Sequence, residues 1–177
     1  MLIELLISIV VLTIGLGGLM VLLVSAMYTN TRAGKDTTST MVAEHVLEQI
    51  SAQPADATIP PIPLQITDCT NAIWVIDPGG ATLGAGTGAN GGNGADLTAG
   101  GVVDWTQSYA SVPGNYKMQY TACGAGGRQT VYDVRWNVIT MTNYTRLVVV
   151  SARPTGSAAV GGLRFVIPAN LRTIAGM

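Results

Sequence analysis

Apolar residues dominate the first part of the chain. After Glu4 no charged residue occurs until Arg32, and residues 5–26 are interrupted only by glycines and by the hydroxyl side chains of Ser8, Thr13 and Ser25. A helix of about 20 apolar residues spans the hydrocarbon core of a bilayer, whereas the apolar region of a signal peptide is typically about 7–15 residues long. The pattern therefore predicts a transmembrane helix over residues 1–26.

A different pattern follows over residues 27–53. Apolar side chains there recur with the i, i+3, i+4, i+7 spacing of a helix that has one buried stripe, at Ala43, Val46, Leu47 and Ile50. We expect these residues to continue the same helix and to pack the stripe against a sheet. Pro54 marks the end of the helix, because the residue before a proline disfavours helical backbone.

Runs of strand-forming residues occupy much of the remaining segment, residues 54–177. They lie at residues 73–76, 115–123, 131–141, 145–153 and 163–167. The run over residues 131–141 alternates, which predicts one apolar face with Val134 and Trp136 and an opposite face with polar residues such as Arg135. Residues 142–144 suit a hairpin turn, and successive strands joined by short turns indicate an antiparallel meander. The predicted fold class is α+β, with a long N-terminal helix packed on a C-terminal antiparallel sheet.

Residues 79–101 contain ten glycines in twenty-three positions. Such a stretch predicts a flexible, exposed loop in the sheet domain, because it offers little apolar surface to bury. Residues 91–96 match the start of a calcium-binding nonapeptide repeat, but those sites need stacked copies and the chain has one. We expect a surface loop and no metal site, and the stretch lacks the Gly-Lys-Ser/Thr ending of a phosphate-binding loop.

Glu4 lies among apolar neighbours near the start of the chain. An acidic side chain inside an apolar segment costs on the order of 2–3 kcal/mol and suggests a function. A carboxylate at the edge of the membrane is the simpler alternative. A functional carboxylate needs a nearby cation, and the nearest candidate is a free α-amino group, either of the same chain or of a neighbouring copy.

The N-terminal residues MLIELLISIVVLTIGLGGLM resemble the mature N-terminus of type IV pilins and pseudopilins, which commonly reads aromatic-Thr-Leu-Ile-Glu-Leu. The Leu-Ile-Glu-Leu core matches at residues 2–5. In that family the glutamate is the fifth residue, so Met1 corresponds to the second position and the aromatic first residue is absent. The stretch over residues 131–154 is also similar to the C-terminal sheet of minor pilins of the pilus modification class.

This resemblance implies a mode of assembly and a location. A prepilin peptidase removes a leader, the new N-terminus is methylated, and subunits leave the inner membrane to form an extracellular helical filament of identical copies. Glu4 then pairs with the terminal amine of the adjacent subunit, which places Glu4 and Met1 in the assembly site. The implied partners are the pilus assembly machinery and minor pilins, and the implied roles are attachment, motility and DNA uptake.

Gly15, Gly17 and Gly18 make residues 14–19 the weakest part of the predicted helix, since glycine costs about 1 kcal/mol relative to alanine in a helix interior. One interpretation is close packing between helices through small residues. The other is that the segment loses its helical hydrogen bonds on assembly and becomes extended, as pilins do near the corresponding positions.

Cys69 and Cys123 are the two cysteines of the chain. A bond between them would close a loop worth roughly 4 kcal/mol by chain-entropy arguments and is expected to form outside the cytoplasm. Two free buried thiols are the alternative, and the spacing does not suit a zinc site.

Composition excludes several functions. Charged residues make up 11% of the chain and the net charge is −1, which is atypical of a nucleic-acid-binding domain. His45 is the one histidine, expected to face solvent or to pack partly, and no nucleophile motif is present, so we expect neither an enzyme nor a cofactor. The alternatives to a pilus subunit are a pseudopilin of a type II secretion system and a monomeric, membrane-anchored periplasmic binding module.

Overall fold

The computed structural model describes residues 2–56, 62–124, 127–155 and 167–176. The chain divides into two compact units, Met1–Lys35 and Asp36–Met177. Helix α1, Leu2–Ser51, supplies all of the described residues of the first unit and begins the second. Its last residue lies three positions before Pro54, in agreement with the predicted end.

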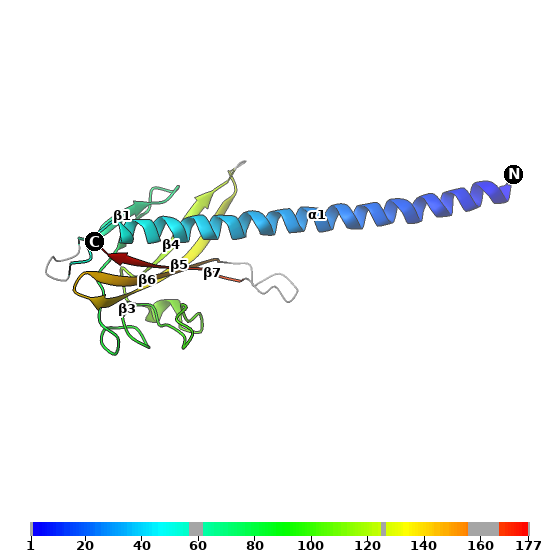
Figure 1. The fold of residues 1–177 in the computed structure, drawn as a ribbon. Helices are drawn as coiled ribbons and strands as arrows, with labels where there is room; N and C mark the ends of the chain where they lie inside the picture. Colours follow the sequence, from blue (N-terminus) through cyan, green and yellow to red (C-terminus); the bar gives the residue numbers. More distant parts are fainter. Residues whose placement is uncertain (1, 57–61, 125–126, 156–166, 177) are drawn as a thin grey trace. The chain divides into compact units, whose positions relative to one another are not determined.

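The predicted stripe of α1 is confirmed. Ala43, Val46 and Ile50 are fully buried and Leu47 packs against the same core. His45 lies off the stripe and is exposed, as expected. The amphipathic spacing thus fixes which face of α1 covers the sheet (Figure 1).

The main sheet is antiparallel, in the order β4-β5-β6-β7. Its strands are β4 Lys117–Cys123, β5 Gln129–Thr142, β6 Thr145–Pro154 and β7 Ala169–Gly176. The short strand β3, Asn93–Gly94, pairs with β5 beside β4. A separate hairpin consists of β1, Leu64–Thr67, and β2, Ile73–Ile76. The α+β class and the meander from β4 to β6 are confirmed.

Three strands were not expected from the sequence: β1, β3 and β7. The predicted strand over residues 163–167 lies almost entirely outside the described residues, and the strand that follows β6 in the described part is β7. The expected connector over residues 54–63 likewise lies partly outside the described residues. Asparagine and glycine in β3 and β7 are poor strand formers, so their local signal is weak.

Strand β5 is buried on both of its faces. Tyr120 of β4 lies opposite Tyr132 in the register and lines a groove together with residues of α1, so the face that carries Val134 and Trp136 points towards α1. Both of these side chains are fully buried. The alternation predicted for residues 131–141 therefore correctly separates this apolar face from a polar one.

The polar face of β5 is also covered, by the segment over residues 88–111. Arg135 donates from Nη2 to Asp133 Oδ2 at 2.8 Å and from Nη1 to the Gln107 carbonyl at 2.6 Å. Asn137 donates from Nδ2 to the Ala95 carbonyl at 2.7 Å. Burying the Arg135 guanidinium and the Asn137 amide nitrogen is tolerated because each donates a hydrogen bond to the covering segment.

Aromatic rings from the same segment intercalate between cations of the sheet. Trp105 has the guanidinium of Arg135 at 4.6 Å and that of Arg153 at 4.1 Å from its ring centroid. Tyr109, in the 3-10 helix η1 (Tyr109–Ser111), has Lys117 Nζ at 4.7 Å. Cation–π contacts of this kind contribute about 0.5–2 kcal/mol each, so they hold the segment on the sheet.

The glycine-rich stretch follows the prediction of an exposed loop only in its first part, since residues 82–90 are mostly exposed whereas residues 91–97 are mostly buried. Ala95 and Leu97 are buried in the core, β3 pairs with β5, and Ala81 forms an isolated bridge with Ile139. Gly94 has φ of 117°, and a Cβ there would overlap the Trp136 carbonyl oxygen and the Tyr116 ring. Glycine serves here for close approach of backbone to the sheet, a use that composition alone does not reveal.

The C-terminal end of α1 is bound to the sheet by Arg146 of β6. Its Nη2 donates to the carbonyl oxygens of Ile50 and Gln53, each at 2.6 Å, and Nη1 donates to the Pro78 carbonyl at 3.3 Å. Carbonyl groups at a helix C-terminus lack intrahelical partners and carry partial negative charge, so a cation is favoured there. Burial lowers the pKa of this guanidinium, which the carbonyl contacts offset.

Asp68 organises the turn between β1 and β2. Its Oδ1 accepts from Thr70 N, Thr70 Oγ1 and Ala72 N at 2.7–3.0 Å. Its Oδ2 accepts from Trp74 Nε1 and from Thr121 N of β4, each at 3.3 Å. Desolvation by burial raises the pKa of Asp68, but these hydrogen bonds together lower it well below the ordinary value. One carboxylate thus joins the hairpin to the main sheet.

Substitution of Gly94 by alanine tests the close approach of the glycine-rich segment. Gly94→Ala should destabilise the protein by about 2 kcal/mol or more, because it adds a strained positive φ and an overlap with Trp136. Urea unfolding of the full chain in detergent, followed by tryptophan fluorescence, measures the change. Gly114→Ala is the control, since a Cβ there meets open space at an unstrained φ. Equal stabilities of the two variants would contradict the assignment.

Acidification tests the role of Asp68. A carboxylate with a lowered folded pKa stabilises the protein above its unfolded pKa of about 4, and that contribution is lost as the pH falls towards the folded value. Asp68→Asn should cost about 2–3 kcal/mol at pH 7 and should flatten the decline in unfolding free energy below pH 4. Asp104→Asn, which changes a turn carboxylate bonded only to Thr106, should leave most of that decline intact. An unchanged acid profile in Asp68→Asn would rule out the proposed linkage.

Candidate assembly surface

The first unit presents apolar side chains around the whole circumference of α1. Eighteen large apolar residues between Ile3 and Tyr28 are exposed, with relative exposures from 46% to 72%. In the described part of the chain, α1 is the helix long and apolar enough to cross a membrane by length and composition, and none of its most apolar window is buried. A helix that is apolar all round requires a lipid or protein environment.

Three hydroxyl groups of α1, those of Ser8, Thr13 and Thr29, donate hydrogen bonds to backbone carbonyls of the same helix. Ser8 Oγ donates to the Glu4 carbonyl at 2.8 Å, and Thr13 Oγ1 donates to the Val10 carbonyl at 2.9 Å. Thr29 Oγ1 donates to the Ser25 carbonyl at 3.0 Å. These side chains therefore add little cost in an apolar environment, since their donors are already occupied.

Glu4 is the acidic residue in the first turn of α1, and its side chain is exposed on the apolar surface. A carboxylate in the first turn of a helix is favoured by the helix dipole. Met1 lies outside the described residues. The pairing of Glu4 with an N-terminal amine in an assembly therefore stays a prediction.

Gly15, Gly17 and Gly18 lie within the continuous helix α1 of the single chain. A Cβ at any of the three would meet nothing within 4 Å, so each position is open to a neighbour. The predicted loss of helix at these residues concerns the assembled filament and stays a prediction. Close packing through small side chains is the other interpretation, and it also concerns an assembly.

The predicted disulfide is confirmed. Cys69 and Cys123 are bonded, with Cα atoms 5.9 Å apart and a sequence separation of 54. The bond links the turn between β1 and β2 to the last residue of β4, next to the hydrogen bond between Asp68 and Thr121. The hairpin is thus held to the sheet by one covalent and one charged contact. A disulfide suits a domain outside the cytoplasm.

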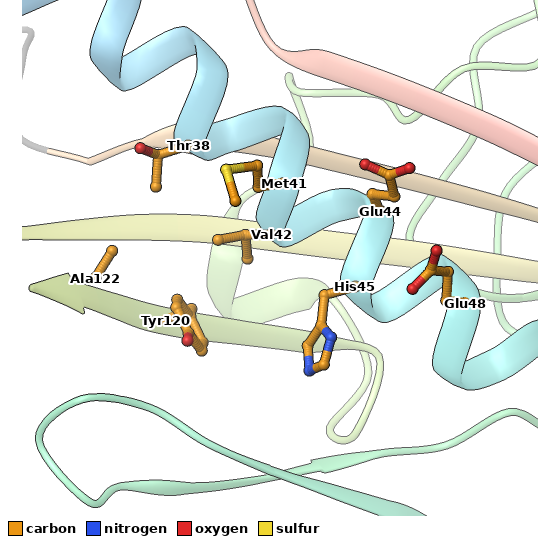
Figure 2. A pocket seen from close by; sticks show the side chains of 8 residues that line it. All are labelled: Thr38, Met41, Val42, Glu44, His45, Glu48, Tyr120 and Ala122. Carbon is orange, nitrogen blue, oxygen red and sulfur yellow. The ribbon is translucent and has the colours of Figure 1, made fainter.

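A groove separates α1 from β4 in the second unit (Figure 2). It has a volume of about 580 Å³ and is lined by Thr38, Met41, Val42, Glu44, His45, Glu48, Tyr120 and Ala122. Met41 and Glu44 are exposed, and no lysine or arginine lines the groove. Sequence reasoning missed the groove, because no local pattern shows that β4 lies opposite the charged residues of α1.

Metal binding has no support in the part of the chain that the structure describes. No group of three or more histidine, cysteine, aspartate and glutamate side chains there is arranged to hold a metal ion. The aspartate of the calcium-like motif, Asp96, accepts a hydrogen bond from Ala89 N at 2.7 Å within its own loop.

No protein-family model matches the chain, and comparisons with curated proteins and with solved structures find no match. The architecture itself is pilin-like. A long apolar N-terminal helix continues into a half that packs on a C-terminal antiparallel sheet, and a disulfide braces that sheet.

Proposed function

We propose that this chain is the structural subunit of a type IV pilus, a helical filament that it builds through the apolar part of α1. The observation that supports the proposal is the uncovered apolar surface of the helix, which carries a single acidic side chain at Glu4. Two environments suit such a surface: the inner membrane before assembly, and a bundle of identical helices afterwards.

Hydrophobicity alone does not favour one of these environments over the other. Removing eighteen large apolar side chains from water is worth on the order of 30 kcal/mol. Lipid supplies that gain as well as protein does, because lipid tails are as apolar as leucine side chains. The choice between membrane and filament therefore depends on charged groups, whose burial in lipid is unfavourable.

Glu4 is such a group. A carboxylate in the apolar region of a membrane costs on the order of 2–3 kcal/mol, and pairing with a positively charged terminal amine would offset this cost. In the filament the amine belongs to an adjacent copy, so the pair also selects one axial register between neighbouring helices. A register set in this way gives every subunit the same environment, as a helical filament requires.

The sheet domain fits the outside of such a filament. Its disulfide favours a location beyond the cytoplasm, and its core is independent of the apolar part of α1. The pilus assembly machinery and minor pilins are the expected partners. The resemblance to pilins implies roles in attachment, motility and DNA uptake.

Electron microscopy of cells that express the chain tests this proposal directly. We expect surface fibres that can be sheared off and that contain the chain as their main component by mass spectrometry. A chain found only as membrane-anchored monomers would support a periplasmic binding module instead. Short fibres confined to the periplasm would favour a pseudopilin of a secretion system.

Glu4→Ala separates anchoring from assembly. Insertion into the membrane should be unchanged or improved, because the variant removes a charge from an apolar helix. The yield of sheared filaments should fall about tenfold or more, since 1.4 kcal/mol already corresponds to a factor of ten in an equilibrium constant. Membrane fractionation and quantification of sheared fibres measure the two effects.

Ser8→Ala is the matched control for Glu4→Ala. It lies one helical turn away and removes a hydroxyl whose hydrogen bond is internal to the helix, so both insertion and assembly should persist. Filaments at wild-type yield from Glu4→Ala would show that the carboxylate does not set the register.

A further inference from the structure

The groove between α1 and β4 combines an apolar floor with a negatively charged rim. Val42, Tyr120 and Ala122 contribute the apolar part, and Glu44 and Glu48 lie four residues apart along α1. Like charges at this spacing lie on neighbouring turns and repel each other. Figure 2 shows both carboxylates with His45 on the helix side of the groove. An occupant that brings a cation on an apolar stem would complement both features.

The opposite edge of the sheet offers such a group. Among the described residues, strand β7 pairs with β6 alone, and its sequence, ANLRTIAG, contains a single charge, at Arg172. Arg172 is exposed, and Ile174, two residues further along the same face of the strand, has a relative exposure of 65%. A cation beside an exposed apolar side chain is complementary to the acidic and apolar lining of the groove.

Sheet topology places these two surfaces on opposite sides of the domain. The order β4-β5-β6-β7 puts β4 at one edge and β7 at the other. If the β7 edge of one copy contacts the groove of the next, each copy retains one unused groove and one unused edge. Such a heterologous contact does not close on itself and therefore propagates, which is the geometry of an open helical assembly.

We infer that Arg172 and Ile174 of one subunit dock into the groove lined by Glu44, Glu48 and Tyr120 of an adjacent subunit. This inference rests on the proposed filament and names the contact between its sheet domains. The guanidinium would lie between the two carboxylates, and the isoleucine would cover the apolar floor. The ligand of the groove is thus a second copy of this chain.

Arg128 is the other exposed cation of the described sheet domain, and it is a poor candidate. It lies between Gly127 and Gln129, so it has no exposed apolar neighbour to enter the groove with it. This difference makes Arg128→Glu the matched control for Arg172→Glu, since both reverse one exposed charge and leave the net charge of the chain equal.

A charge-swap experiment tests the contact in cells that express the full chain. Glu48→Arg and Arg172→Glu alone should each lower the yield of sheared filaments about tenfold, because each places like charges against each other at the interface. The double variant, Glu48→Arg with Arg172→Glu, should recover most of the wild-type yield. Arg128→Glu should assemble normally. Non-reducing gel mobility, which reports the bond between Cys69 and Cys123, confirms that each variant folds.

The possible outcomes separate this inference from the proposed function. Absence of fibres from wild-type cells would remove the filament proposal itself. Fibres from wild-type cells together with full assembly of either single variant would overturn the docking contact and leave the filament standing. Failure of the double variant to recover, with its disulfide intact, would overturn the contact as well.

Discussion

Helix α1 has two parts whose side chains require different surroundings, and the rest of the structure depends on this difference. From residue 3 to residue 28 the helix has no polar face, so the chain alone leaves it uncovered. From Asp36 onward the apolar side chains gather into one stripe that the sheet covers. The first part therefore needs other molecules, and the second part makes a self-sufficient domain.

The self-sufficient domain is organised around β5. Its apolar face packs towards α1, and its polar face is closed by a segment that brings two aromatic rings between the cations of three strands. Arg146 adds a third connection, from β6 to the carbonyl groups at the end of α1. Helix, sheet and covering segment are thus joined by contacts that involve every layer.

Periodic features of the sequence predicted the structure well. The stripe from Ala43 to Ile50 and the alternation along β5 both follow from the geometry of one element, which a local pattern records. The pairing of Cys69 with Cys123 was also accessible, because two cysteines allow only one bond. Glu4 was recognisable as a single charge in a long apolar run. Its neighbours in an assembly belong to other copies of the chain, so the structure of one chain does not contain them.

Other features depend on residues far apart in the sequence and were not accessible. The cover over Asp133 and Arg135 comes from Trp105 and Gln107, whose approach no local pattern encodes. The glycine-rich stretch was assigned to solvent because composition does not separate flexible glycines from those that permit close contact, as Gly94 does. The groove beside Glu44 and Glu48 forms only when β4 is placed next to α1.

The proposed filament requires that the Glu4 carboxylate be neutralised by the N-terminal amine of an adjacent copy. A density map of the assembled filament at side-chain resolution tests it most directly. We expect the Glu4 carboxylate to lie within about 4–6 Å of a neighbouring N-terminal amine, inside the bundle of helices and away from water. A carboxylate that faces solvent in the filament, or one surrounded by apolar side chains alone, would contradict it.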